Sequence, residues 1–161
     1  MPGEEVKMSK IHDEKEILLH LREKEIAVVS TKDAKENLLR SRVMYYGVDD
    51  RFVCYLMSLK RSPMVEQVNI EKGLSMLVCA LEDPFDRSWE VEINGLAQTL
   101  TLQKEINNAL LMLKGRNPFA DVALEAGITA QFDFVKLTPK FVRYRIYSEV
   151  LDQIPPTIIR F

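Results

Sequence analysis

The chain has 161 residues and a formal net charge of −2, from 22 lysine and arginine residues against 24 aspartate and glutamate residues. This length predicts a single domain over residues 1–161, and 47% hydrophobic with 29% charged residues excludes disordered, collagen-like and disulfide-scaffold classes. No run approaches the ~18 apolar residues of a membrane span, and the first sixteen residues, MPGEEVKMSKIHDEKE, lack the pattern of a signal peptide. We therefore expect a cytoplasmic protein without a membrane partner, and the near-neutral charge gives no reason to expect a nucleic-acid partner.

The first half of the chain predicts a helix followed by strands. The expected helix covers residues 9–25, with Ser9 as N-cap and Ile11, Leu18 and Leu21 on one stripe. A strand over residues 26–31, a polar turn over 32–36, and two paired strands over 37–48 and 51–58 follow. The turn between the paired strands is expected at Asp49-Asp50, with two residues in the loop.

The second half mixes short helices with strands. Ser62-Pro63 predicts the start of a helix that ends at Gly73. Further elements are expected as follows: strands over 73–81 and 88–101, helices over 102–115 and 117–127, and strands over 130–137 and 141–148 joined through Thr138-Pro139-Lys140. Residues 1–8 and 152–161 are expected to be tails. In the second of these ranges, Pro155-Pro156 forbids regular strand pairing. The pattern predicts an α+β fold, with six or seven antiparallel strands in a small barrel and flanking helices.

Several kinds of site lack support in the sequence. The six glycines are isolated, so neither a phosphate-binding loop nor a dinucleotide fingerprint can be written. His12 and His20 stand eight residues apart with no cysteine beside them, which gives no support for a metal site. Cys54 and Cys79 fall in apolar stretches and are expected to be reduced core thiols. No serine lies in a sequence typical of a strained nucleophile turn, so a catalytic Ser-His-Asp triad is not indicated.

The positive signal is a convergence of cations. In a regular hairpin closed by Asp49-Asp50, Arg42 lies opposite Met57 and Arg40 opposite Leu59. Lys60 and Arg61 then arrive at the same end, beside the helix that begins at Ser62. A helix N-terminus with nearby cations makes a site for a phosphate-sized anion, although a solvated basic loop explains the same spacing about as well.

The segment SRVMYYGVDDRFVCYLMSLKRSPMVEQV, residues 41–68, resembles the strand-turn-strand-basic-loop-helix segment of the pyridoxamine 5′-phosphate oxidase-like, flavin-binding split-barrel family. WEVEINGLAQTL, residues 89–100, is similar to a later strand of that family, and the order of elements agrees over residues 10–150. The resemblance implies an antiparallel split barrel that forms a homodimer, with flavin mononucleotide (FMN) at the subunit interface.

The resemblance also implies which residues hold FMN. Arg42 matches the arginine that reaches the phosphate, Val43 and Met44 line the cofactor, and Tyr55 and Leu56 pass near the flavin ring through their backbone. Lys60, Arg61 and Ser62 match the basic phosphate loop, and Glu90 stands where the oxidase has glutamine. Glu90 also reads as a solvated carboxylate, and Trp89 as a core anchor or an interface residue. Arg143 and Arg145 are open to roles toward substrate, the second subunit or solvent.

Three functions follow. The first is an FMN-dependent oxidoreductase with a small-molecule electron donor or acceptor; vitamin B6 oxidation is not indicated, since the oxidase's C-terminal substrate pattern is missing from YSEVLDQIPPTIIRF. The second is a non-catalytic binding or sensing module for flavin, deazaflavin or haem on the same fold. The third is a barrel that uses Arg40, Arg42, Lys60 and Arg61 on phosphates of RNA or DNA, against which the acidic balance counts.

Overall fold

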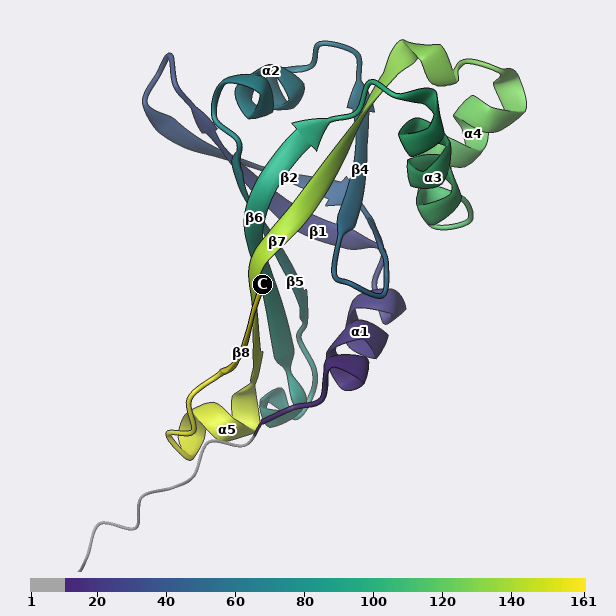
Figure 1. The fold of residues 1–161 in the computed structure, drawn as a ribbon. Coiled ribbons are helices and arrows are strands. Elements are labelled where there is room, and N and C mark those ends of the chain that lie inside the picture. Colours follow the sequence, from purple (N-terminus) through teal and green to yellow (C-terminus); the bar gives the residue numbers. More distant parts are fainter. Residues whose placement is uncertain (1–10) are drawn as a thin grey trace, which may run out of the picture.

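The computed structural model describes residues 11–161, and its framework is a curled antiparallel sheet (Figure 1). The strand order is β2-β1-β5-β6-β7-β4-β3, and β8 pairs with β7 outside this path. The strands are β1 (Ile26–Asp33), β2 (Leu38–Tyr45), β3 (Gly47–Val48), β4 (Cys54–Leu59), β5 (Gly73–Ala80), β6 (Trp89–Thr99), β7 (Phe132–Ile146) and β8 (Thr157–Arg160). The α+β split-barrel prediction is confirmed, with eight strands in place of the expected six or seven.

Helices flank the sheet. The described residues contain α1 (Glu14–Glu23), α2 (Pro63–Ile70), α3 (Gln103–Leu113), α4 (Pro118–Ala126) and α5 (Tyr147–Leu151), with short 3₁₀ turns η1 (Phe85–Arg87) and η2 (Thr129–Gln131). None of these helices is both long and apolar enough to span a bilayer.

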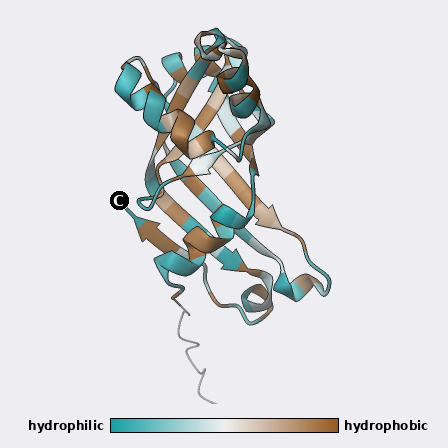
Figure 2. Cartoon of the chain, turned by 90° about the vertical axis from the view of Figure 1, so that its right-hand side faces the viewer, coloured by the Kyte–Doolittle hydropathy of each residue, from teal (hydrophilic) through white to brown (hydrophobic). Residues whose placement is uncertain are grey.

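Two hydrophobic cores lie on either side of β4. The larger core joins the inner face of the sheet to α1 and α2 and includes the buried Trp89, which confirms the core role expected for it. The smaller core joins α3 and α4 to β4 and β7. Apolar and polar residues alternate along the strands, which appear as brown and teal bands in Figure 2, because successive side chains point to opposite faces. Cys54 and Cys79 are both free thiols, but only Cys54 is in the core; Cys79 is exposed.

The first helix begins later than predicted. Asp13 is its N-cap and accepts a hydrogen bond from the backbone N–H of Lys15 at 2.8 Å. Ser9 lies outside the described residues. Leu18 and Leu21 are buried as expected, but Ile11 precedes the helix and is exposed, so its place on the apolar stripe is wrong.

The predicted hairpin at Asp49-Asp50 is wrong. β2 pairs with β1, so Arg42 lies opposite Val29 and Arg40 opposite Thr31. Of the strand predicted over residues 37–48, only the two residues of β3 pair with β4. Residues 49–53 form a longer loop. The Asp49 carboxylate shapes this loop by accepting hydrogen bonds from the backbone N–H groups of Arg51 and Val53. A side chain that satisfies loop N–H groups favours a wider turn over a two-residue one.

Two other boundaries differ from the sequence prediction. α2 begins at Pro63 with Ser62 as N-cap, as predicted, but it ends at Ile70, and Gly73 already belongs to β5. The tail after Pro155-Pro156 does pair: β8 follows the prolines and joins β7. The prolines themselves stay outside the ladder, since they lack an N–H donor.

The two strands expected around Pro139 form one continuous strand, β7. Pro139 lies opposite Gly95 at a register shift in β6. A Cβ atom at Gly95 would meet the carbonyl oxygen of Thr138 at 2.0 Å, so the two backbones approach more closely than any side chain permits. The bulge and the glycine together let a proline sit inside a long strand.

Candidate functional site

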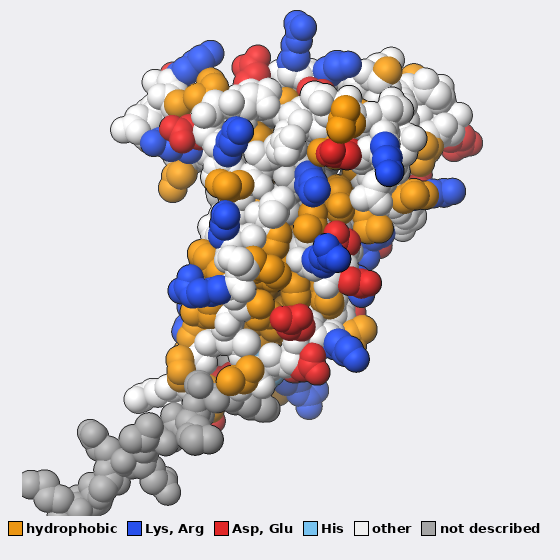
Figure 3. All heavy atoms as spheres, in the orientation of Figure 1, with side chains coloured by type: hydrophobic (Ala, Val, Ile, Leu, Met, Phe, Trp, Pro, Cys, Tyr) orange, Lys and Arg blue, Asp and Glu red, His pale blue; other side chains and the backbone are white. Residues whose placement is uncertain are grey.

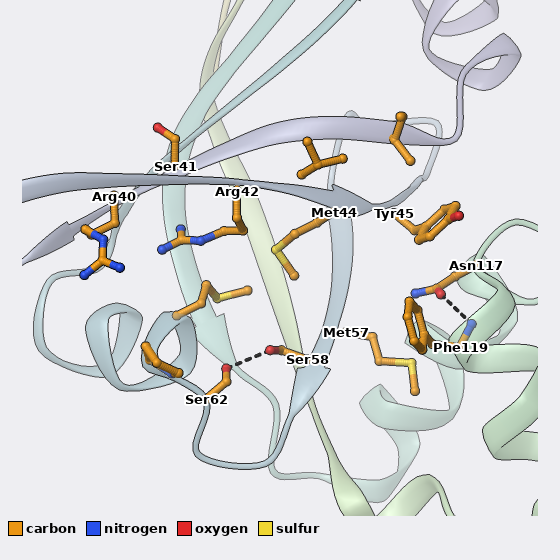
Figure 4. A pocket seen from close by; sticks show the side chains of 14 residues that line it. Arg40, Ser41, Arg42, Met44, Tyr45, Met57, Ser58, Ser62, Asn117 and Phe119 are labelled. Carbon is orange, nitrogen blue, oxygen red and sulfur yellow. Dashed lines mark hydrogen bonds between the residues drawn. The ribbon is translucent and has the colours of Figure 1, made fainter.

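A cavity of about 570 Å³ lies between the edge strand β2 and the start of α2, and we call it the β2–α2 cavity (Figure 4). Its volume falls in the range of roughly 300–1,000 Å³ that is usual for small-molecule sites. It is lined by Ile26, Arg40, Ser41, Arg42, Val43, Met44, Tyr45, Met57, Ser58, Ser62, Pro63, Met64, Asn117 and Phe119. One end is cationic and the other is lined by methionine and aromatic side chains.

Arg42 is fixed at the cationic end by neutral groups. Its Nη1 donates to the hydroxyl of Thr31 at 2.7 Å and to the carbonyl oxygen of Val29 at 3.3 Å, and its Nη2 donates to Oε1 of Gln67 at 3.1 Å. The Thr31 hydroxyl in turn donates to Gln67 Oε1 at 2.6 Å. The guanidinium has more N–H donors than these three bonds use, so donors remain for a ligand.

The positive charge of this end is not matched by carboxylates. Within residues 11–161 no carboxylate pairs with Arg42, and Arg40 has only Asp33, at 3.7 Å. Among the described residues, no acidic side chain lines the cavity. Burial lowers the pKa of Arg42, and the neighbouring charge of Arg40 lowers it further. Two adjacent cations in this state favour an anionic ligand.

The first turn of α2 closes the cationic end. The Ser62 hydroxyl caps the helix, accepting from the backbone N–H of Val65 at 3.4 Å, and it lies 2.7 Å from the hydroxyl of Ser58. Pro63 and Met64 of the same turn also line the cavity. The positive end of the helix dipole thus faces the same space as the two arginines.

The opposite end suits a planar ring. Figure 4 shows Met44 and Met57 between the arginines and the aromatic pair Tyr45 and Phe119. The two aromatic rings lie 6.3 Å apart, edge to face. Methionine and aromatic side chains offer polarisable surfaces to a flat ligand. The cavity therefore fits a molecule with a phosphate at one end and a ring at the other.

Of the predicted phosphate loop, only Ser62 reaches this cavity. The Lys60 ammonium turns toward η2 and donates to the carbonyl oxygen of Ala130 at 3.2 Å. Arg61 has a left-handed backbone, with φ 58°, and its N–H donates to Asp133. Neither residue lines the cavity. The expected meeting of four cations is thus reduced to Arg40 and Arg42.

The remaining predicted residues divide between the cavity and other places. Val43 and Met44 line it. The side chain of Leu56 is in the larger core, and that of Tyr55 is in the smaller core, where its hydroxyl accepts from Asn108 at 3.1 Å. Both residues precede Met57, which does line the cavity, on the same strand. In this chain the structure does not bring Glu90 to the cavity; Glu90 lines a separate pocket beside α5.

Sequence reasoning missed two groups of residues at this site. Thr31 and Gln67 hold Arg42, and Asn117 and Phe119 bring α4 to the cavity. The capping role of Asn117 was visible in the sequence, and its side chain does accept from the N–H of Phe119 at 2.9 Å. Its approach to β2, far away in the sequence, carried no local signal.

Comparison with known proteins gives a fold but no close relative. No protein-family model matches the chain, and no curated protein matches it. Among solved structures, a putative pyridoxamine 5′-phosphate oxidase from Listeria innocua has a TM-score of 0.64 and 20% identity, covering 84% of this chain and 98% of its own.

Two structures from Mycobacterium smegmatis are named for what they bind. An FAD-binding protein has a TM-score of 0.65 and 14% identity over 84% of this chain and 98% of its own. A haem-binding protein has a TM-score of 0.66 and 15% identity over 86% of this chain and 55% of its own. The chain therefore has the pyridoxamine 5′-phosphate oxidase-like split-barrel fold, which confirms the resemblance seen in the sequence at the level of fold.

Proposed function

We propose that this protein binds FMN in the β2–α2 cavity and acts as a flavin-dependent oxidoreductase on a small molecule. The observation that carries the proposal is the two-ended cavity, in which Arg42 has no carboxylate partner among residues 11–161 and a methionine and aromatic surface lies at the other end. The fold shared with a putative pyridoxamine 5′-phosphate oxidase and with an FAD-binding protein supports the choice of a flavin.

The residues would divide the work as follows. Arg42 and Arg40 hold the phosphate, with the Ser62 turn of α2 beside it. Met44, Met57 and Tyr45 orient the ring, and Phe119 limits access to it from α4. The bound flavin supplies the hydride or electron transfer. Thr31 and Gln67 keep the guanidinium of Arg42 in place before the cofactor arrives, so little side-chain entropy is lost on binding.

We further propose that two copies form a homodimer and that the cofactor lies at their interface. Val43, Val28 and Leu77 stand side by side across β2, β1 and β5 on the outer face of the sheet, and all three are exposed. Val43 also lines the β2–α2 cavity. A partner on this face would therefore adjoin the cofactor. Val28→Glu is expected to shift the protein toward monomer in sedimentation velocity and to weaken FMN binding.

The test of the phosphate contact compares two ligands. FMN carries the phosphate and riboflavin lacks it, so loss of the Arg42 cation should affect only FMN. We expect Arg42→Ala to weaken FMN binding about tenfold or more, as for a lost charge-assisted hydrogen bond, and to leave riboflavin binding within about twofold. Fluorescence titration measures both affinities.

The control is Arg160→Ala, because Arg160 is exposed on β8 and lines none of the described cavities. An equal loss for FMN and riboflavin would mean that Arg42 supports the cavity without holding the phosphate. If wild-type protein binds neither ligand, the flavin proposal fails. Oxidation of a nicotinamide donor by the FMN-loaded protein, with repeated turnover, tests the oxidoreductase part.

The second candidate is a non-catalytic module for flavin, deazaflavin or haem, favoured by the fold shared with a haem-binding protein. The part of the chain that the structure describes brings no histidine or cysteine to the cavity, but Met44, Met57 and Tyr45 are side-chain types that ligate haem iron elsewhere. The visible spectrum of the purified protein separates the cases, since haem gives a Soret band and oxidised flavin does not.

A further inference from the structure

A second pocket of about 250 Å³ lies at the opposite end of the sheet, where η1 packs against α5 (Figure 1). We call it the α5 pocket; it is lined by Phe85, Glu90, Arg145, Tyr147, Val150 and Leu151. Three of these are apolar side chains that remain exposed: Phe85, Val150 and Leu151. The other three are polar and come from β6, β7 and the first residue of α5.

The two charged residues of this lining, Glu90 and Arg145, do not pair with each other. Glu90 lies opposite Arg145 in the β6–β7 register, yet its Oε1 pairs with Nη1 of Arg143, at 3.8 Å. The pKa of Tyr147 is raised, first by desolvation and then by the nearby charge of Glu90. The Glu90 carboxylate is thus paired with Arg143, and within residues 11–161 Arg145 has no ion pair of its own.

The remaining charge belongs to Arg145, which has an unsatisfied donor. Its Nε is buried and has no hydrogen-bond partner within residues 11–161. Leaving a buried donor of a charged group unpaired costs free energy, and such groups in folded proteins usually have a partner or await one. Because Nε is closed to solvent, a ligand in the pocket would meet the Nη groups of Arg145, which donate charge-assisted hydrogen bonds to a carboxylate.

The surroundings restrict the anion. A phosphate dianion needs more than one free cation, and here Glu90 stands beside the single one. A carboxylate brings one negative charge, and the exposed Phe85, Val150 and Leu151 offer an apolar wall for its body. The volume limits the ligand to a small molecule.

We propose that the α5 pocket is a second binding site, which takes a small organic monocarboxylate with an apolar body. Arg145 receives the carboxylate through its Nη groups, Phe85, Val150 and Leu151 cover the apolar part, and Glu90 stays paired with Arg143. The proposal does not depend on flavin binding, because its residues share nothing with the β2–α2 cavity.

The probe is phenylacetate, with phenylacetamide as its neutral counterpart. Titration followed by ¹⁵N chemical shifts of the full-length protein should give millimolar binding of phenylacetate, with the largest shifts at Tyr147 and Val150. Phenylacetamide should bind at least tenfold more weakly. Equal binding of the two probes, or shifts centred away from this pocket, would overturn the proposal.

Two variants test the residues. Arg145→Gln should weaken phenylacetate binding at least tenfold and leave the weak binding of phenylacetamide unchanged, whereas Arg160→Gln, on the exposed part of β8, should leave both unchanged. Leu151→Glu places a negative charge at an exposed position of the α5 pocket and should also weaken phenylacetate binding. This variant provides the test if Arg145→Gln does not fold. Unchanged phenylacetate affinity in the folded variants would refute the assignment. Unchanged FMN affinity in them separates this result from the proposed function.

Discussion

The β2–α2 cavity and the residues around His12 handle charge in opposite ways. In the β2–α2 cavity, Arg42 is held by neutral oxygens and has no carboxylate partner within residues 11–161. Beside α1, His12 is enclosed between two carboxylates, with Nε2 at 2.6 Å from Glu149 and Nδ1 at 3.0 Å from Glu16. We call the second arrangement the His12 cluster. His12 and Glu149 are both buried.

The difference separates groups that stabilise the fold from groups available to a ligand. The His12 cluster joins the start of α1 to α5, and the backbone N–H of His12 also donates to Thr157 of β8 at 3.1 Å. Its donors and acceptors are matched within the chain. The cavity leaves charge unmatched, and the outer face of the sheet leaves apolar side chains exposed. Figure 3 shows hydrophobic side chains among charged side chains of both signs on one face of the molecule. Unmatched groups of this kind mark sites of interaction.

The largest effect on stability is expected from breaking the His12 cluster. His12→Ala leaves the buried Glu149 carboxylate without its partner, so we expect the free energy of unfolding to fall by about 3 kcal/mol. Arg42→Ala leaves no carboxylate unpaired and should cost about 1 kcal/mol. Urea denaturation of both variants measures the contrast. Equal losses of unfolding free energy in the two variants would mean that the His12 cluster and Arg42 contribute equally to stability, against this prediction.

A second prediction concerns the stability of the protein at alkaline pH and depends on Tyr144, beside the His12 cluster. Burial, with Glu16 and Glu149 nearby, raises the pKa of Tyr144 from 10.0 to about 12. A folded-state pKa above the unfolded value means that the stabilisation is present below pH 10 and is lost as the pH rises toward 12. Denaturation midpoints should therefore fall across this window, and less steeply in Tyr144→Phe. Identical slopes in the two proteins would exclude Tyr144 as the group responsible.

A smaller effect is expected from the second cation of the cavity. Arg40 is exposed, so Arg40→Gln should weaken FMN binding by only a few fold, and the loss should shrink at high salt because exposed charges are screened. The unfolding midpoint should stay nearly constant, since the change also removes repulsion with Arg42. FMN titrations at low and high ionic strength measure this. A loss independent of salt would point to a direct, desolvated contact instead.

The smallest effect is expected at an exposed ion pair. Arg22 Nη2 lies 2.6 Å from Asp50, but both side chains are largely in solvent. Arg22→Ala should change the free energy of unfolding by less than about 0.5 kcal/mol. Thermal melts against wild type provide the measurement, and a loss comparable with His12→Ala would contradict the link between burial and stabilisation.

The sequence predicted that Arg42 lies near the start of α2, but through the wrong strand pairing. The prediction placed Arg42 near the start of α2 by pairing its strand with β4, which is wrong. Arg42 reaches α2 all the same, because β2 pairs with β1 and its side chain passes Thr31 to Gln67. The signal for the true hairpin was present in the polar turn before Asn37, whose φ of 53° suits an asparagine.

Other features had no local signal. The break expected at Pro139 was contradicted because Gly95, on the neighbouring strand, accommodates the proline. Lys60 and Arg61 leave the cavity because of contacts with Ala130 and Asp133, about seventy residues onward. Caps such as Ser62 and Asn117, which act on their own helices, were predicted correctly.

The fixing of α1 has a consequence for the order of folding during synthesis. Arg116 donates through Nη1 to the carbonyl oxygen of Arg22 at 3.0 Å and through Nη2 to that of Lys24, at the end of the helix. At the other end of the helix, the His12 side chain is hydrogen-bonded to Glu149. The helix is thus made early on the ribosome. Tyr46, which donates to the carbonyl oxygen of Leu21, follows soon after it, but the two end contacts form late. We expect α1 to remain incompletely docked on nascent chains that stop before residue 116, and to become fully protected from proteolysis only when α5 has left the exit tunnel.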